Sequence, residues 1–192
     1  SDVAPVADMN ACEFALSGTI GEQELPNLRA RLQMFCGDER PFKCWERHLA
    51  HELSLEADRK QATHLRIINF KPQDPQSEWR LEMLGEQAHQ DRSRSRVRNV
   101  YASFASGDVF RFLQHLNCKF QYECIKEGTY FHKEAVVCRI YHLFKMPVEG
   151  DIAKRELVHR DYIVECSLTA NAEAKLETED QLMQFANLLR PF

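Results

Sequence analysis

The segment VVCRIYHLF, residues 136–144, indicates the fold class. Every second residue in it falls on one face of an extended chain: Val136, Cys138, Ile140, His142 and Phe144. The same period of two recurs in EWRLEML at 78–84 and in YIVECSL at 162–168. Because this period is typical of half-buried β-strands, the three segments predict a β-rich protein.

Further stretches of the sequence also have strand character. They are 14–20, 45–56, 65–70, 97–104 and 120–126, and the strand that contains the opening segment is predicted to span 130–145. The Glu127–Thr129 stretch between the last two predicts a hairpin turn. No alternation of strands with helices is seen, so the eight strands are predicted to be antiparallel. Eight such strands are enough to close a barrel, and an open sandwich fits the same pattern.

Three helices are predicted to accompany the strands. The first carries its apolar residues on one face and ends at a glycine: Leu25, Leu28, Leu32, Phe35 and Gly37. Ser106 is a good N-cap for a second, short helix that ends at Leu116. Thr178 and Gln181 form a capping box for the third.

The composition is that of an ordinary globular domain. The 192 residues are 44% hydrophobic and 28% charged, which fits one domain. The net charge of -4 gives no overall attraction to nucleic acid or to an anionic membrane. No apolar run approaches the roughly 18 residues of a membrane span. Composition therefore gives no reason to expect a nucleic-acid or membrane partner.

Seven cysteines are scattered along the chain, and none forms a C-x-x-C pair. The first residues lack the features of a secretory signal, so free thiols in a reducing compartment are expected. Cys138 and Cys166 alternate with other residues in predicted strands, where cysteine behaves as a small hydrophobic residue. We therefore expect these two to pack in the core.

The sequence contains no recognisable catalytic or cofactor motif: no P-loop, dinucleotide-binding glycine motif or nucleophile elbow is present. The segment HLAHE at 48–52 resembles a zinc-protease motif but has the wrong order of residues. It lies in a predicted strand, where His48 and His51 point to opposite faces. We therefore predict no catalytic residue, no metal ligand and no cofactor.

Two alternatives remain open on the residues alone. Barrels that cleave triphosphates line a tunnel with glutamates that hold a metal and with basic residues that hold phosphates. Glu78, Arg80 and Glu82 share one strand face and carry this hint. The first strand, 14–20, has no charge, and a strand face exposed to water shows the same alternation. The expectation is therefore that these three residues lie on a solvated exterior.

The second alternative is a nucleic-acid-binding module, indicated by an arginine run. Arg92, Arg94 and Arg96 alternate with serines, and such a run can form a phosphate-contacting loop. No aromatic residues interleave with it to stack on bases. A solvated loop that leads into a strand is the favoured interpretation.

Several pieces of the chain, in the right order, resemble Mediator subunit 18. They are FALSGTI at 14–20, the helix that ends at 36–37, WRL and LG within 79–85, the stretch from 97 through the helix at 110–116 to 133, the strand at 162–167 and the helix at 185–191. The resemblance implies an all-β fold with accessory helices, an eight-stranded antiparallel barrel flanked by about three helices. We predict that barrel as a single domain over residues 12–192, after a mobile N-terminal tail at 1–11.

The same resemblance implies a function without catalysis. Members of the family are subunits of the Mediator head module, a nuclear assembly that contacts RNA polymerase II and its initiation machinery. It implies pairing with Mediator subunit 20, a C-terminal helix of Mediator subunit 8 as tether, and contacts to other head subunits. A protein-interaction scaffold in the nucleus is thus expected, with no membrane and no direct sequence-specific contact to nucleic acid.

Apolar residues outside the helical stripes predict a partner surface. In the second helix Val109, Phe112, Leu113 and Leu116 lie on one face, which is expected to pack on the barrel. Phe110 lies about 100° from Val109 around the helix, at the edge of that stripe. Met183 and Leu188 lie outside the stripe of the last helix. We predict that Phe110, Met183 and Leu188 border a surface that receives a helix or a second barrel.

Overall fold

The computed structural model describes residues 11–55, 59–72, 74, 77–87, 95–171 and 175–190. The tail predicted at 1–11 lies outside these residues, except for Ala11, which belongs to the first strand. No helix among the described residues has both the length and the apolar character needed to cross a bilayer.

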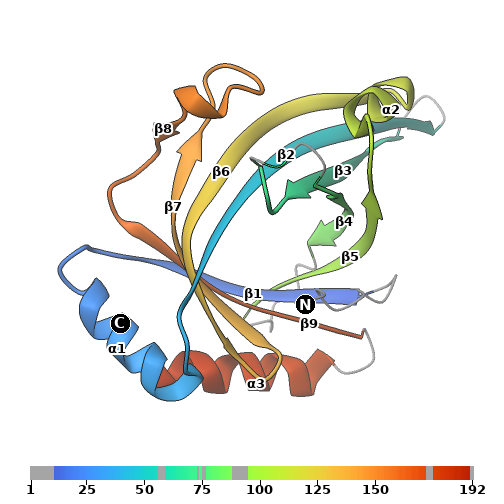
Figure 1. The fold of residues 1–192 in the computed structure, drawn as a ribbon. Coiled ribbons are helices and arrows are strands. Elements are labelled where there is room, and N and C mark those ends of the chain that lie inside the picture. Colours follow the sequence, from blue (N-terminus) through green and yellow to red (C-terminus); the bar gives the residue numbers. More distant parts are fainter. Residues whose placement is uncertain are drawn as a thin grey trace.

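The strands form a closed antiparallel barrel (Figure 1). They are β1 (Ala11–Ile20), β2 (Arg40–Leu55), β3 (Arg59–Asn69), β4 (Trp79–Gln87), β5 (Arg96–Ala105), β6 (Cys118–Lys133), β7 (Val136–Lys145), β8 (Glu156–Leu157) and β9 (Tyr162–Asn171). Around the barrel the order is β6-β2-β3-β4-β5-β1-β9-β7, and pairing of β7 with β6 closes the ring. The short β8 pairs with the end of β7 as an extra strand. The predicted eight-stranded barrel is confirmed, and the sandwich is excluded by this closure.

The predicted hairpin turn at Glu127–Thr129 is wrong. β6 runs straight through these residues, and the turn lies at 134–135, where Glu134 has a φ of 54°. Gly128 stands where two backbones approach closely, because a Cβ there would lie 2.1 Å from the carbonyl oxygen of Ile140. Glycine marks this contact rather than a turn, and a sequence does not separate the two uses.

The helices are α1 (Leu25–Cys36), α2 (Val109–His115) and α3 (Lys175–Leu188), and two of them begin elsewhere than predicted. The N-cap of α2 is Asp108, whose carboxylate accepts a hydrogen bond from the backbone N–H of Arg111, so Ser106 is not the cap. α3 starts three residues before Thr178, which therefore lies inside the helix and does not form a capping box.

Both apolar cores lie outside the barrel wall. α1 and α3 lie along one side, where Leu28, Leu32, Leu182 and Phe185 pack on apolar residues of β1, β6, β7 and β9 (Figure 1). α2 packs on a second cluster that includes Ile67 and Trp79. Cys138 and Cys166 are buried in the first core, as predicted. Because successive residues of a strand point to opposite faces, the alternate residues of these strands point into the barrel.

α2 presents a different face to the barrel than predicted. Val109 and Leu113 are buried, but Phe112 and Leu116 are about half exposed, at 57% and 48%. The half-buried Phe110 contributes instead, since its ring packs edge-on against Trp79 with the ring centres 4.8 Å apart. The apolar residues of this helix extend to both sides of Val109, and only the tertiary contacts select the Phe110 side.

Candidate functional site

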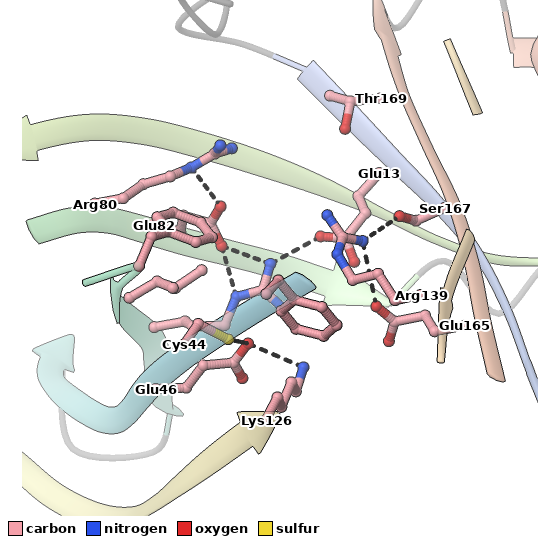
Figure 2. Close-up of a pocket in the computed structure, with 14 residues that line it drawn as sticks. Glu13, Cys44, Glu46, Arg80, Glu82, Lys126, Arg139, Glu165, Ser167 and Thr169 are labelled. Carbon is pink, nitrogen blue, oxygen red and sulfur yellow. Dashed lines mark hydrogen bonds and ion pairs between the residues drawn. The ribbon is translucent and has the colours of Figure 1, made fainter. Parts of the chain in front are cut away.

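Charged side chains fill the interior of the barrel. They come from seven strands and line a cavity of about 120 Å³: Glu13, Glu46, Arg66, Arg80, Glu82, Lys126, Arg139 and Glu165 (Figure 2). The hydroxyl-bearing residues Ser167 and Thr169 line it as well. The interior therefore differs from the apolar filling of an ordinary small barrel, and each buried charge needs a partner.

Arg66 of β3 is the centre of the first group of ion pairs. Its Nη2 lies 2.9 Å from Oε2 of Glu13, and its Nε lies 2.6 Å from Oε2 of Glu82. The other oxygen of each carboxylate is also occupied. Arg98 Nη2 lies 2.8 Å from Glu13 Oε1, and Arg80 Nε lies 2.8 Å from Glu82 Oε1. The guanidinium of Arg66 thus joins its own strand, β3, to β4 and to β1.

A second group of ion pairs lies near β6, β7 and β9. Lys126 Nζ is 2.9 Å from Glu46 Oε1. Arg139 donates a hydrogen bond to Ser167 Oγ at 2.8 Å and lies 3.6 Å from Glu165 Oε1. Each of the four interior carboxylates therefore has at least one basic partner within 4 Å.

Two opposing effects set the protonation states of these groups. Burial favours the neutral form, and the nearby charges of opposite sign favour the ionised form. Burial alone would raise the pKa of Glu13, but Arg66 and Arg98 outweigh it and hold that pKa at about 2. Burial would also raise the pKa of Glu46, and Lys126 with its neighbours lowers it instead. Burial lowers the pKa of Lys126, but Glu46 and Glu165 raise it overall. These charges therefore remain ionised at neutral pH.

The free energy of unfolding is expected to fall as pH is lowered from about 5 to about 2. Glu13 has an ordinary pKa of 4.5 and a folded-state pKa of about 2, so the unfolded chain takes up the proton first. Its stabilisation, about 3 kcal/mol, is fully present above pH 5 and is lost across this window. Urea unfolding at several pH values measures the loss. Glu13→Gln should show a smaller loss, and an equal loss would contradict this assignment.

Two expectations about charges on the strands are wrong. Arg80 and Glu82 do not lie on a solvated exterior; they point into the barrel, and Glu82 is 3% exposed. Glu78 is exposed and precedes β4. The first strand also carries an interior charge, because it begins at Ala11 and includes Glu13. Extending the alternation backward from Phe14 would have found Glu13, but alternation does not tell the inner face of a barrel from the outer.

The arginine run is only partly described. Arg92 and Arg94 lie outside the described residues. Arg96 begins β5, and its Nη2 lies 3.9 Å from both Glu13 Oε1 and Glu165 Oε2, at the edge of the interior group. The phosphate-contacting role of this loop stays a prediction.

The three predicted partner residues lie on two separate helices. Phe110 packs against Trp79 and lies 4.2 Å below the guanidinium carbon of Arg47. Met183 and Leu188 are half-buried on α3. Leu188 lines a groove between α3 and the turn that joins β6 to β7. The structure therefore does not bring these residues into one patch, and their role as partner contacts stays a prediction.

Comparisons of the sequence with known proteins agree on one family. The family described as Med18 protein matches residues 54–192. The Xenopus laevis protein named Mediator of RNA polymerase II transcription subunit 18 is 30% identical over 185 residues, which cover 95% of this chain and 86% of that protein.

Two solved structures share the fold. A chain in the Schizosaccharomyces pombe Mediator head module has a TM-score of 0.75 at 16% identity, covering 94% of this chain and 96% of that one. The PH1819 protein from Pyrococcus horikoshii has a TM-score of 0.58 at 15% identity, covering 93% and 90%. At these identities the two structures show a shared fold alone. The family is shown by the family model and by the Xenopus laevis relative. This chain belongs to the Med18 protein family, the family of Mediator subunit 18.

Proposed function

We propose that this chain is a non-catalytic subunit of the nuclear Mediator head module, where it serves as a protein-interaction scaffold in RNA polymerase II transcription. The observation that carries the proposal is the 30% identity to a Mediator subunit 18 over 95% of the chain. The shared fold with a chain of the fission yeast head module supports it. Other Mediator subunits are accordingly its partners.

The finer assignment is pairing with Mediator subunit 20 and tethering by a C-terminal helix of Mediator subunit 8. Phe110, Met183 and Leu188 are proposed to border the surfaces that these partners cover. The exposed Phe112 and Leu116 on α2 support a partner near Phe110, because they continue its apolar surface outward. The groove beside Leu188 has apolar walls at Val136 and Phe185 and supports a second contact there.

The partner assignment predicts a stable complex when the full chain is co-expressed with Mediator subunits 20 and 8. Alanine at Phe110, Met183 or Leu188 should weaken binding by more than about 1 kcal/mol for at least one of them, because apolar anchors carry most interface energy. Titration calorimetry or surface plasmon resonance measures this. Met34→Ala is the matched control, since Met34 is 78% exposed on α1.

Melting of each isolated variant separates a contact from a packing defect. A variant that melts like the wild type but binds more weakly supports the surface, whereas a large drop in melting temperature assigns the residue to the core. Affinity purification from cells tests the assembly itself. Recovery of the chain without any other Mediator subunit would overturn the proposal.

Absence of catalysis is supported by the way in which the interior charges pair. A glutamate that holds a catalytic metal needs free oxygens, but both oxygens of Glu13 and of Glu82 face arginines. A tunnel hydrolase would need these pairs to open.

Phosphate release from a nucleoside triphosphate with Mg²⁺ or Mn²⁺ is therefore expected to stay at the background rate. A colorimetric phosphate assay measures it. The contrary outcome is turnover that disappears in Glu82→Ala, with Glu78→Ala as the exposed control, and it would establish the enzymatic alternative.

A further inference from the structure

Three metal-ligating side chains meet where β2 pairs with β6, beside the charged interior. Glu46 of β2 lies directly opposite Cys124 of β6, and His48 is two residues further along the same face of β2. A carboxylate oxygen, an imidazole nitrogen and the thiol sulfur of these residues lie within 4.8 Å of one another. Among the described residues this is the only such group of three. Glu46 and Cys124 are buried, and His48 is half-buried.

Two neighbours hold the carboxylate and the imidazole in place. Lys126 lies 2.9 Å from Oε1 of Glu46, which leaves the other oxygen, Oε2, facing His48 Nε2 at 3.5 Å. The imidazole stacks on the ring of Tyr122, with ring centres 4.3 Å apart and an angle of 13° between the planes. Tyr122 is 56% exposed and His48 is half-buried, so the imidazole is the member of the group most accessible to solvent.

The backbone is irregular at the same place. The register of β2 against β6 shifts between His48 and Leu49, so that one β6 residue, Gln121, has no partner there. Such bulges locally disrupt the hydrogen-bond ladder and re-aim side chains. A metal ion bound by residues of both strands would hold β2 and β6 in one register at the point where their backbone hydrogen bonds are interrupted.

The residue types match one metal. Zinc takes cysteine sulfur at about 2.3 Å and histidine nitrogen or carboxylate oxygen at about 2.0–2.2 Å, in tetrahedral sites. Ligand atoms around such an ion lie roughly 3.3–3.8 Å from one another. The three atoms here lie within 4.8 Å of one another, so small side-chain movements would bring them to coordination distance. We propose that Glu46, His48 and Cys124 bind a zinc ion, with water as the fourth ligand and Lys126 positioning Glu46.

Metal binding releases one proton and raises the net charge of this site by one. The Cys124 sulfur–hydrogen bond breaks, its proton passes to solvent, and the thiolate bonds to Zn²⁺. Thiolate and carboxylate then carry two negative charges against the three positive charges of Zn²⁺ and Lys126. Lys126 keeps its ion pair with Oε1, on the oxygen that does not face His48. No local motif predicts this group, because Cys124 lies far from Glu46 and His48 in the sequence and only the β2–β6 register brings it beside them.

Titration of the metal-free full chain with Co²⁺, followed by its visible and near-ultraviolet absorption, tests the proposal. The wild type should bind one Co²⁺ with a thiolate-to-cobalt charge-transfer band and an intense tetrahedral spectrum, and Zn²⁺ should displace it. His48→Ala and Cys124→Ser should each weaken binding at least tenfold. Cys118→Ser and His51→Ala are matched controls that should bind like the wild type.

Several outcomes would overturn the site. They are absence of the charge-transfer band in the wild type, unchanged affinity in Cys124→Ser, or loss of binding in His51→Ala. Zinc should also raise the melting temperature of the wild type and not that of Cys124→Ser. If Cys124→Ser fails to fold, the wild-type spectrum and His48→Ala still decide, because the band itself reports a thiolate ligand.

Discussion

Gly128→Ala is expected to destabilise the protein by about 3 kcal/mol or more, because a methyl group there meets backbone and not a flexible side chain. Its Cβ would lie 2.1 Å from the carbonyl oxygen of Ile140 and 2.6 Å from Cα of Tyr141. β6 and β7 would have to separate at the seam that closes the barrel. Thermal unfolding should show a drop of roughly 6–12 °C in melting temperature for a chain of this size.

Gly18→Ala is the matched control. Gly18 lies in β1, and nothing lies within 4 Å of a Cβ placed there. Its melting temperature should stay close to that of the wild type, or rise slightly, because alanine restricts the unfolded chain. Equal effects of the two substitutions would show that β7 gives way to a methyl group at Gly128, and the close approach would then not explain this glycine.

Arg66→Met is expected to cost about 3–5 kcal/mol of unfolding free energy. The substitution keeps much of the side-chain volume but leaves the carboxylates of Glu13 and Glu82 facing each other across the interior without their shared cation. Because Glu13 then keeps only Arg98 of its two close basic partners, its pKa should rise, and acid should destabilise the variant less steeply than the wild type. Urea denaturation at pH 7 and at pH 4 measures both effects.

An exposed ion pair provides the comparison. Lys145 lies 3.0 Å from Glu156 between β7 and β8, and both side chains are more than half exposed. Lys145→Met should change the unfolding free energy by less than about 1 kcal/mol, because water and salt screen such pairs. If Arg66→Met is equally mild, the interior is open enough to water for its charges to be solvated individually.

The alternation of residues predicted most of the strands because each strand has two chemically different faces. It could not assign those faces: Arg80 and Glu82 have the pattern of a solvated exterior and line the interior instead. In an ordinary small barrel the apolar faces of the strands point inward. In this barrel the apolar faces point outward, where the helices cover them. Whether an apolar face packs on a helix or points to the barrel centre depends on contacts between segments far apart in sequence. The period of two along a single strand contains no information on those contacts.

Local chemistry predicted turns less well than strands. Asn117, with a φ of 58°, follows α2 in the left-handed conformation that asparagine often adopts at the end of a helix. Gly128 looked like a turn residue in the sequence, but it is needed for a close approach between strands. The turn itself contains Glu134, which has a positive φ of 54°. Glutamate is not a typical turn residue, so the sequence did not indicate a turn there. Charged residues such as Lys126 and Glu46 could be placed together only after the register of β2 and β6 was known.

The charged lining of the barrel also determines how stability responds to temperature. Unfolding exposes the apolar surface beneath the helices together with the ionic surface of the interior. Newly hydrated apolar area raises the heat capacity, whereas newly hydrated polar area lowers it, so the two contributions partly cancel. The heat-capacity change of unfolding should therefore be smaller than for a barrel of equal size whose interior is apolar. A smaller change flattens the curve of free energy against temperature and widens the range over which the fold persists.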